Sequence, residues 1–418
     1  MPNLKTEMFE PGLSFENFVV TTPVCCPSRS TFLRGQYVHN HKVYMNVAPA
    51  GSFEAFNLQG HEASTVGTWL QAAGYETALM GKYLNRYPFS DDKEYVPPGW
   101  SEWYVPAKGK PYTSFNYTLN ENGVLVEYYS KPEDYITDVL GDKAIDFIQR
   151  SAETDAPFFL FLSIYAPHEP AIPAPRHAEL FPELQAPRTP GFDEENMDDK
   201  PIYMQQDPQL SEGDIARIDE LYRLRLQSMQ AVDEMLPELV AALEASGQLE
   251  NTYIIFTSDN GFHMGQHRQI IGKSNPYEED IRVPFVVRGP GVSSGVTLTE
   301  YVGASIDWAP TVAELAGVTP PDYVDGRSLV PLFGENRPDP GDWRQLVLIE
   351  FFGHKSEEGK QVKPFYLSIR TVDYVFIDYP GSDFHELYDL ENDPYQIESL
   401  VNSMPQELLD ELIELTEA

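Results

Sequence analysis

Two short apolar runs, each followed at once by polar residues, constrain the fold of this chain most strongly. Residues 158–165 and 253–257 have the length and the aromatic and β-branched content of buried strands. Helices are predicted before them, over residues 134–150 and 212–246. Strands that alternate with helices are typical of an α/β fold with a mostly parallel central sheet and helices on both faces. Ligands of such sheets bind beyond the carboxyl ends of the strands, where the polar residues of this chain follow.

Similar elements continue to about residue 340, where the pattern changes. The expected elements are an N-terminal helix, strands through 18–20, 75–80 and 283–287, helices over 64–74 and 307–316, and a hairpin near 115–126. Pro237 is expected to interrupt the helix over 212–246. Later come short strands at 346–352, 365–370 and 374–379 and a final helix from about 405. We therefore expect an α/β domain over 1–340 and a small antiparallel subdomain with a terminal helix over 341–418.

Cys25 and Cys26 are the only cysteines of the chain and stand side by side. Adjacent cysteines are poorly placed to bridge each other, so a reactive role for one of them is plausible. Pro27 is suited to the first turn of a helix, where free N–H groups favour an anion. Arg29 adds a planar donor fork that matches a tetrahedral oxyanion. The stretch therefore predicts a thiol at a helix start, in a site that binds sulfate or phosphate.

The composition excludes several classes of function. The formal net charge of −36 disfavours nucleic acid and anionic membranes as partners, and an anionic substrate would need a local basic pocket. No run approaches the ~20 apolar residues of a membrane span. No signal peptide is recognised at the N-terminus, and two cysteines do not define a compartment.

Cys25-x-Pro27-Ser28-Arg29, followed by Leu33-x-Gly35, resembles the signature of the formylglycine-dependent sulfatases, which belong to the alkaline phosphatase-like superfamily. The wider string from Thr21 to His41 is similar to N-acetylglucosamine-6-sulfatases and extracellular glucosamine endosulfatases. This resemblance implies that a separate maturation enzyme oxidises Cys25 to Cα-formylglycine. Cys26 then fills the variable position of the signature.

Asp259 and Asn260 offer hard oxygen ligands, followed by a flexible Gly261. Residues 257–266 resemble the second metal-ligand motif of sulfatases, which implies Ca²⁺, or alternatively Mg²⁺, bound by residue 25, Asp259 and Asn260. The resemblance also implies an earlier strand ending in an Asp-Asp pair. The printed sequence has no such strand, and we expect a truncation or a misplaced start codon to explain this departure.

The resemblance extends to three further catalytic positions. Lys82, in Gly81-Lys82-Tyr83, and Lys273, in Gly272-Lys273, match lysines that contact the sulfate, and His168 matches the histidine of an Ala-Pro-His motif. A histidine titrates near neutrality and can protonate a leaving alkoxide. Four other histidines are candidates for lining the pocket, although structural roles are equally compatible with the sequence: His39, His41, His263 and His267.

The implied activity is hydrolysis of sulfate esters on glycans, with 6-O-sulfated glucosamine units as the expected substrate. The hydrated formylglycine would attack sulfur, Arg29, Lys82, Lys273 and the metal would stabilise the sulfate oxygens, and His168 would protonate the departing sugar oxygen. Aromatic residues within 86–132 could stack on sugar faces or serve as packing. Two alternatives stay open: a phosphoesterase or phosphonate hydrolase on the same fold, and a non-catalytic glycan-binding homologue. The family implies an exported or lysosomal protein.

Overall fold

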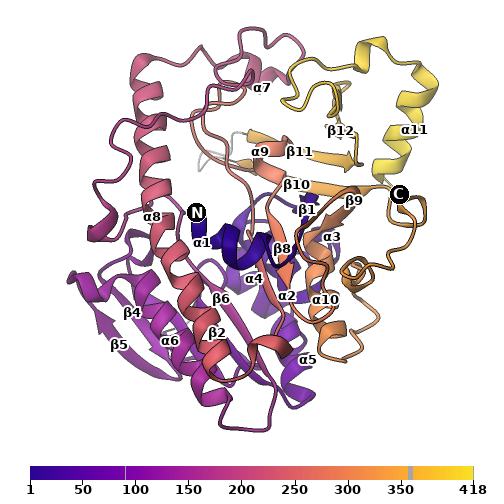
Figure 1. Ribbon diagram of the computed structural model, residues 1–418. Helices are drawn as coiled ribbons and strands as arrows, with labels where there is room; N and C mark the ends of the chain where they lie inside the picture. The colour runs from indigo at the N-terminus through magenta and orange to yellow at the C-terminus, as the bar shows by residue number, and fades with distance from the viewer. Residues whose placement is uncertain (90, 356–360, 418) are drawn as a thin grey trace.

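The computed structural model describes residues 1–89, 91–355 and 361–417. Its strands form three sheets with the orders β7-β8-β1-β9, β5-β4-β3-β2-β6 and β10-β11-β12-β13 (Figure 1). The strands of the first two sheets are β1 (Leu13–Val19), β2 (Glu76–Gly81), β3 (Glu102–Gly109), β4 (Tyr117–Glu121), β5 (Val124–Tyr128), β6 (Phe158–Ser163), β7 (Ile254–Thr257), β8 (Phe285–Arg288) and β9 (Val296–Ala304). The helices are α1 (Pro2–Leu4), a π-helical turn (Lys5–Phe9), α2 (Cys25–Arg34), α3 (Val38–His41), α4 (Ser52–Leu58), α5 (Val66–Ala72), α6 (Ile136–Ser151), α7 (Ile202–Gln205), α8 (Glu212–Ala245), α9 (Glu278–Ile281), α10 (Trp308–Leu315) and α11 (Gln406–Glu417).

The α/β class is confirmed, but the strands divide between two mixed sheets where one mostly parallel sheet was expected. β1 pairs with β9, and β2 with β3 and β6, in parallel. β8 is antiparallel to β7 and β1, and β3, β4 and β5 form an antiparallel meander. The tight turn at Asn122 and Gly123 forces β4 and β5 to run in opposite directions. Strands β3 and β9 were not predicted from the sequence.

Helices cover both faces of the sheet that contains β2 and β6. Successive side chains of a strand point to opposite faces, and Ala78 and Met80 pack in one apolar cluster whereas Leu79 packs in another. The first cluster includes residues of α6, and the second includes residues of α5 and α10. Phe159 of β6 and Ile255 of β7 both pack against the cluster that contains Leu79. The strands β6 and β7 are the outer strands of their sheets, and they therefore lie in one layer.

Helix α8 runs without interruption from Glu212 to Ala245, so the break predicted near Pro237 is wrong. The free-energy cost of one proline in a helix is small compared with the stabilisation from packing a long amphipathic face. Helix α8 buries Met235 and Leu236 directly before Pro237. Ser211 caps the start of the helix, where its side chain accepts from the Asp214 N–H.

The C-terminal residues form the antiparallel sheet that the sequence predicted. Its strands are β10 (Val347–Lys355), β11 (Gln361–Arg370), β12 (Tyr374–Asp378) and β13 (His385–Asp389). Ile349 and Tyr366 from this sheet share a buried cluster with Val24 and Ile281 from the larger part of the chain. The backbone N–H of Glu350 also donates to the Thr21 carbonyl (2.9 Å), so the C-terminal sheet supports the segment that leads to Cys25.

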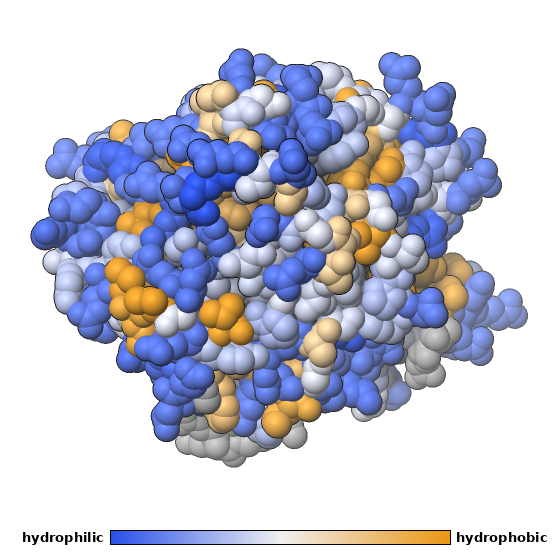
Figure 2. Space-filling model, turned by 90° about the horizontal axis from the view of Figure 1, so that it is seen from below, coloured by the Kyte–Doolittle hydropathy of each residue, from blue (hydrophilic) through white to orange (hydrophobic). Residues whose placement is uncertain are grey.

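The surface is mostly polar. Seen from below the view of Figure 1, hydrophilic residues cover most of the face and apolar residues occur in small separate patches (Figure 2). Within the described ranges, no helix has both the length and the apolar content needed to cross a bilayer.

Candidate active site

The guanidinium of Arg29 forms hydrogen bonds with residues at the ends of three strands. Arg29 Nη2 donates to the Lys82 carbonyl after β2 and to Ser163 Oγ at the end of β6. Its Nη1 pairs with Asp259 Oδ2 after β7 (3.1 Å), and its Nε donates to the Tyr83 carbonyl (2.5 Å). The site therefore lies at the carboxyl ends of β2, β6 and β7, where the rule for parallel strands places it.

Cys25 is the first residue of α2 and is only 1% exposed. Its Sγ lies 2.6 Å from Lys273 Nζ. Burial raises the pKa of the Cys25 thiol, but Lys82, Lys273 and a hydrogen bond from His168 outweigh burial and lower the pKa to about 5. Burial raises the pKa of Cys26 to about 12, because the nearby cations affect Cys26 far less. The fold thus makes the thiol of Cys25 far more acidic than the thiol of Cys26.

Lys82 and Asp259 form a buried ion pair next to Cys25. Lys82 Nζ lies 3.8 Å from Asp259 Oδ2, and the lysine is 5% exposed. Burial lowers the pKa of Lys82, but Cys25 and Asp259 raise it above its ordinary value. Burial raises the pKa of Asp259, but Lys82, Arg29 and Lys273 bring it well below its usual range. Both groups are therefore charged at neutral pH.

Lys273 is held over Cys25 by a loop that is fixed from two sides. Lys363 from β11 donates to the Lys273 carbonyl (2.7 Å) and to Asn275 Oδ1 (2.8 Å). On the other side His263 Nδ1 donates to the Asp280 carboxylate (2.9 Å), and Asp280 also accepts from the Asn275 N–H (2.7 Å). Lys363 was not identified from the sequence, because its role depends on a contact across 90 residues.

His168 reaches the site from the loop after β6. Its Nδ1–H donates to the Glu169 carbonyl (2.8 Å), and the ring packs against Tyr112 with centroids 4.6 Å apart. Because the Glu169 carbonyl can only accept, Nδ1 carries a proton and Nε2 is the nitrogen left for the hydrogen bond with Cys25.

The other candidate histidines lie outside this cluster. His41 is fully buried, hydrogen-bonds Thr31 Oγ1 (3.2 Å), and has its pKa lowered well below the ordinary value by burial. His267 is 1% exposed and pairs with Glu194 (2.6 Å), and buried His263 orients the Lys273 loop. These three present no ring atom to Cys25 among the described contacts. His39 is partly exposed, and its hydrogen bond to Glu350 (2.9 Å) raises its pKa.

The family model named Sulfatase matches residues 1–318, which is most of the chain. The chain belongs to the sulfatase family. A second family model, N-sulphoglucosamine sulphohydrolase, C-terminal, matches residues 265–417. The sulfatase signature around Cys25 therefore identified the family correctly from a short motif.

Individual sulfatases show how far the similarity extends. The chain is 41% identical over 359 residues to a Caenorhabditis elegans homologue of the extracellular sulfatase Sulf-1, covering 84% of this chain and 49% of the relative. It is 33% identical over 440 residues to human N-acetylglucosamine-6-sulfatase, covering 96% of this chain and 78% of the relative. The chain thus spans about half the length of the C. elegans relative. The solved complex of BT4656 with its substrate D-glucosamine-2-N,6-O-disulfate has a TM-score of 0.82 at 24% identity, covering 100% of this chain and 91% of that chain, and shows the same fold.

Sulfatases generally use a formylglycine and a divalent metal, and two residues of this sulfatase have the chemistry to bind the metal. Asp259 Oδ2 faces Arg29 and Lys82, and Asn260 Oδ1 lies 3.3 Å from Lys273 Nζ, so both oxygens already attract cations. Ca²⁺ takes about six to eight oxygen ligands. Within residues 1–89, 91–355 and 361–417, no group of three or more His, Cys, Asp or Glu side chains is arranged to hold a metal. Asp259 and Asn260 therefore fit part of such a site.

Proposed function

We propose that this chain hydrolyses O-sulfate esters on sugars, with a 6-O-sulfated glucosamine unit as the substrate. The observation that carries the proposal is the convergence of Lys82, Lys273 and His168 on Cys25. Two ammonium groups and one imidazole around one atom can bind a dianionic transition state and supply a proton. The names of the two relatives, an extracellular sulfatase and an N-acetylglucosamine-6-sulfatase, support the substrate.

The side chains of the site have different roles in the proposed reaction. Lys82 and Lys273 stabilise the sulfate oxygens, because both ammonium groups face position 25 from fixed positions. Arg29 acts as a positioning residue, since four of its N–H donors are engaged by Lys82, Tyr83, Ser163 and Asp259. Loss of the Arg29 side chain would remove the hydrogen bonds that hold the ends of three strands together.

His168 is assigned as the general acid. With Nδ1–H held by the Glu169 carbonyl, the proton on Nε2 of the imidazolium can move to the departing sugar oxygen. A pocket histidine that packs against Tyr112 is also protected from rotating away.

Two groups that this chain would acquire complete the chemistry. Formylglycine at position 25 supplies a hydrated aldehyde as nucleophile, and a divalent cation, Ca²⁺ or Mg²⁺, supplies positive charge at the sulfate. We propose that Asp259 Oδ2 and Asn260 Oδ1 hold the cation and that a maturation enzyme modifies Cys25. We also propose that the protein is exported, like the extracellular relative.

The test is release of sulfate by matured protein from a panel of esters: 6-O-sulfated N-acetylglucosamine, an aryl sulfate and a phosphonate monoester. We expect the sugar sulfate to have the highest kcat/KM, and Lys273→Met to reduce it by about 10²-fold or more. A phosphonate preference would support the alternative of a phosphonate hydrolase. An aryl sulfate with about ten times the kcat/KM of the sugar sulfate would overturn the glycan substrate alone, since tenfold is about 1.4 kcal/mol in transition-state binding.

Because the described residues supply only part of a metal site, a binding-only homologue is the second candidate. Such a protein would bind the sulfated sugar in calorimetry but release no sulfate even when mass spectrometry shows formylglycine at position 25. Turnover by the matured chain, abolished by Cys25→Ala, would exclude it.

A further inference from the structure

The residues on both sides of His168 are bound by arginines of helix α8. Arg225 Nη1 donates to the carbonyl of Pro167, the residue before the histidine (3.0 Å). Arg217, from an earlier turn of α8, pairs with the carboxylate of Glu169, the residue after the histidine (3.5 Å). The carbonyl of Glu169 in turn accepts the Nδ1–H of His168. The backbone that orients the imidazole is therefore attached to α8 at two points.

The two attachments differ in strength. The side chains of Arg217 and Glu169 are 58% and 45% exposed, and such an ion pair contributes little because water screens it. Arg225 is half-buried, and burial lowers the pKa of its guanidinium to about 10, so that it is still charged at neutral pH. A charged donor that is shielded from water forms a stronger hydrogen bond with a carbonyl. Arg225 is therefore the residue of α8 that can fix the position of the loop.

Arg225 also contacts the loop that follows the proposed metal ligands. The central carbon of its guanidinium lies 4.5 Å from the centre of the Phe262 ring, a distance typical of a cation–π contact. Phe262 comes shortly after Asn260, and its own N–H donates to the Glu279 carbonyl (2.7 Å), which fixes its backbone. One guanidinium thus connects the loop of His168 to a second loop of the active site.

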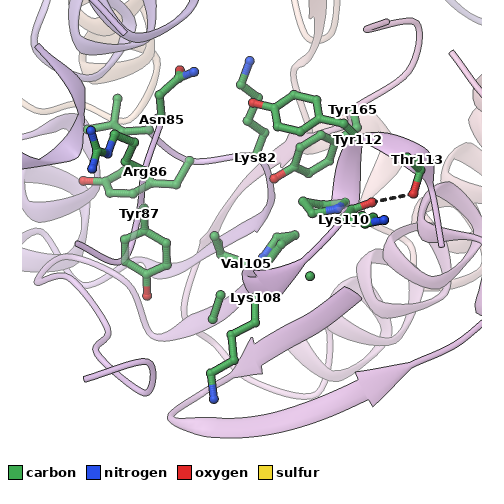
Figure 3. Close-up of a pocket in the computed structure, with 16 residues that line it drawn as sticks. Lys82, Asn85, Arg86, Tyr87, Val105, Lys108, Lys110, Tyr112, Thr113 and Tyr165 are labelled. Atoms are coloured by element: carbon green, nitrogen blue, oxygen red, sulfur yellow. Dashed lines mark hydrogen bonds between the residues drawn. The ribbon is translucent and has the colours of Figure 1, made fainter. Parts of the chain in front are cut away.

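Aromatic residues support the ring of His168. The ring packs against Tyr112 with centroids 4.6 Å apart, and Tyr112 packs edge-on against Tyr165 at 5.0 Å. In Figure 3 the two tyrosines lie together next to Lys82, and both line a cavity of about 420 Å³. The aromatic contacts orient the ring beside this open space, whereas the hydrogen bond from Arg225 fixes the backbone from which the ring extends.

We propose that Arg225 is a positioning residue for His168: its hydrogen bond to the Pro167 carbonyl holds the imidazole where Nε2 can deliver a proton to the departing sugar oxygen. The proposal rests on the proposed function, which assigns His168 as the general acid. A catalytic group works only in a narrow range of positions, so the loss of one fixed contact behind it lowers the rate of the chemical step.

A double-mutant cycle tests whether Arg225 acts through His168. The values of kcat and KM for 6-O-sulfated N-acetylglucosamine are measured for the matured protein, Arg225→Met, His168→Gln and the double variant. We expect Arg225→Met to lower kcat by about tenfold, the scale of one charge-assisted hydrogen bond, with little change in KM. In the His168→Gln background the same substitution should lower kcat hardly at all, because the group that Arg225 positions is absent. Arg225→Lys keeps the charge and should restore part of kcat.

Arg223 provides a matched control on the same helix. It is also half-buried, and its Nη1 donates to the Leu184 carbonyl at the same distance of 3.0 Å, but Leu184 lies in a loop without a proposed catalytic residue. Arg223→Met should therefore change kcat by no more than about twofold. Equal losses of kcat from Arg225→Met in both backgrounds would assign a general structural role, and a rise in KM alone would assign substrate binding. Either result would overturn the proposal.

Hydrogen exchange tests the contact independently of catalysis. The His168 N–H donates to the Tyr165 carbonyl and the Ala171 N–H to the His168 carbonyl, each at 2.8 Å. Arg225→Met should speed the exchange of the peptide that contains these two amides, and Arg223→Met should not. If Arg225→Met folds poorly, Arg225→Lys is compared instead.

The exchange measurement separates failure of the two proposals. If the matured protein releases no sulfate, the proposed function fails, and exchange alone decides whether Arg225 fixes the loop. Exchange also decides if only the His168→Gln background is inactive. Unchanged exchange in Arg225→Met would overturn the positioning role in either case.

Discussion

Lys273 Nζ lies 2.6 Å from Cys25 Sγ, although 248 residues separate the two in the chain. The contact joins a helix start to a loop that the C-terminal sheet supports through Lys363. It places the Lys273 ammonium group beside the first cysteine of the sulfatase signature, and it lowers the pKa of the unmodified thiol. The predictions below follow from this arrangement.

We expect formylglycine at position 25 and an unmodified thiol at position 26. Both cysteines are buried, but only Cys25 lies among Lys82, Lys273 and His168. Peptide mass spectrometry of active protein should show the aldehyde or its hydrate at residue 25. Cys25→Ala should abolish turnover, and Cys26→Ala should reduce it less. Active protein with only a thiol at residue 25 would contradict this prediction.

The unmodified protein should show an acidic thiol. Because the pKa of Cys25 is lowered to about 5, its thiolate is present above that pH and is lost as the pH falls through 5. Alkylation by iodoacetamide, measured in the presence of a chelator, should therefore rise through pH 5 and be nearly constant between about pH 6 and 8. Lys273→Met should move the midpoint upward, because it removes one of the cations that stabilise the thiolate. A midpoint near the usual value of about 8.5 in the unsubstituted protein would contradict the geometry.

Divalent metal binding should be weak and should depend on Asp259. Among the described residues no group of three or more His, Cys, Asp or Glu side chains is arranged to hold a metal, and Asp259 and Asn260 alone supply far fewer oxygen ligands than Ca²⁺ prefers. Calorimetry with Ca²⁺ and with Mg²⁺ should give dissociation constants of about 10⁻⁴ M or weaker, and Asp259→Asn should weaken binding further. Tight binding that survives Asp259→Asn would show that other groups hold the ion.

Lys363→Met should reduce kcat more than it changes KM. The substitution removes the hydrogen bonds to the Lys273 carbonyl and to Asn275, so the Lys273 ammonium loses its fixed position. We expect a loss of about tenfold, as for a charged hydrogen bond, with partial rescue by Lys363→Arg. The alkylation midpoint of Cys25 should rise in the same variant, which a purely structural role would not cause. Lys131→Met, an exposed lysine of a loop, is the matched control.

The sequence alone determined the family and the α/β class. It also supplied the catalytic candidates and predicted a helix start near Pro27, two residues after the observed start of α2. These depend on local signals: apolar runs of strand length, a proline near a helix start, and short motifs that each follow a strand. The hairpin of β4 and β5 was predictable for the same reason, because its turn contains Asn122 and Gly123. The strands β3, β9 and β13 were missed, and α8 proved continuous through Pro237, because packing against distant segments outweighs local preference.

Only the tertiary structure decided which candidates meet. His41, His263 and His267 are as polar in sequence as His168, but burial and partners such as Asp280 and Glu194 direct them into structural roles. The support of Lys273 by Lys363 also has no local signal. Such features arise from contacts between segments far apart in the chain, and electrostatic interactions depend on separation in space, which sequence order does not specify.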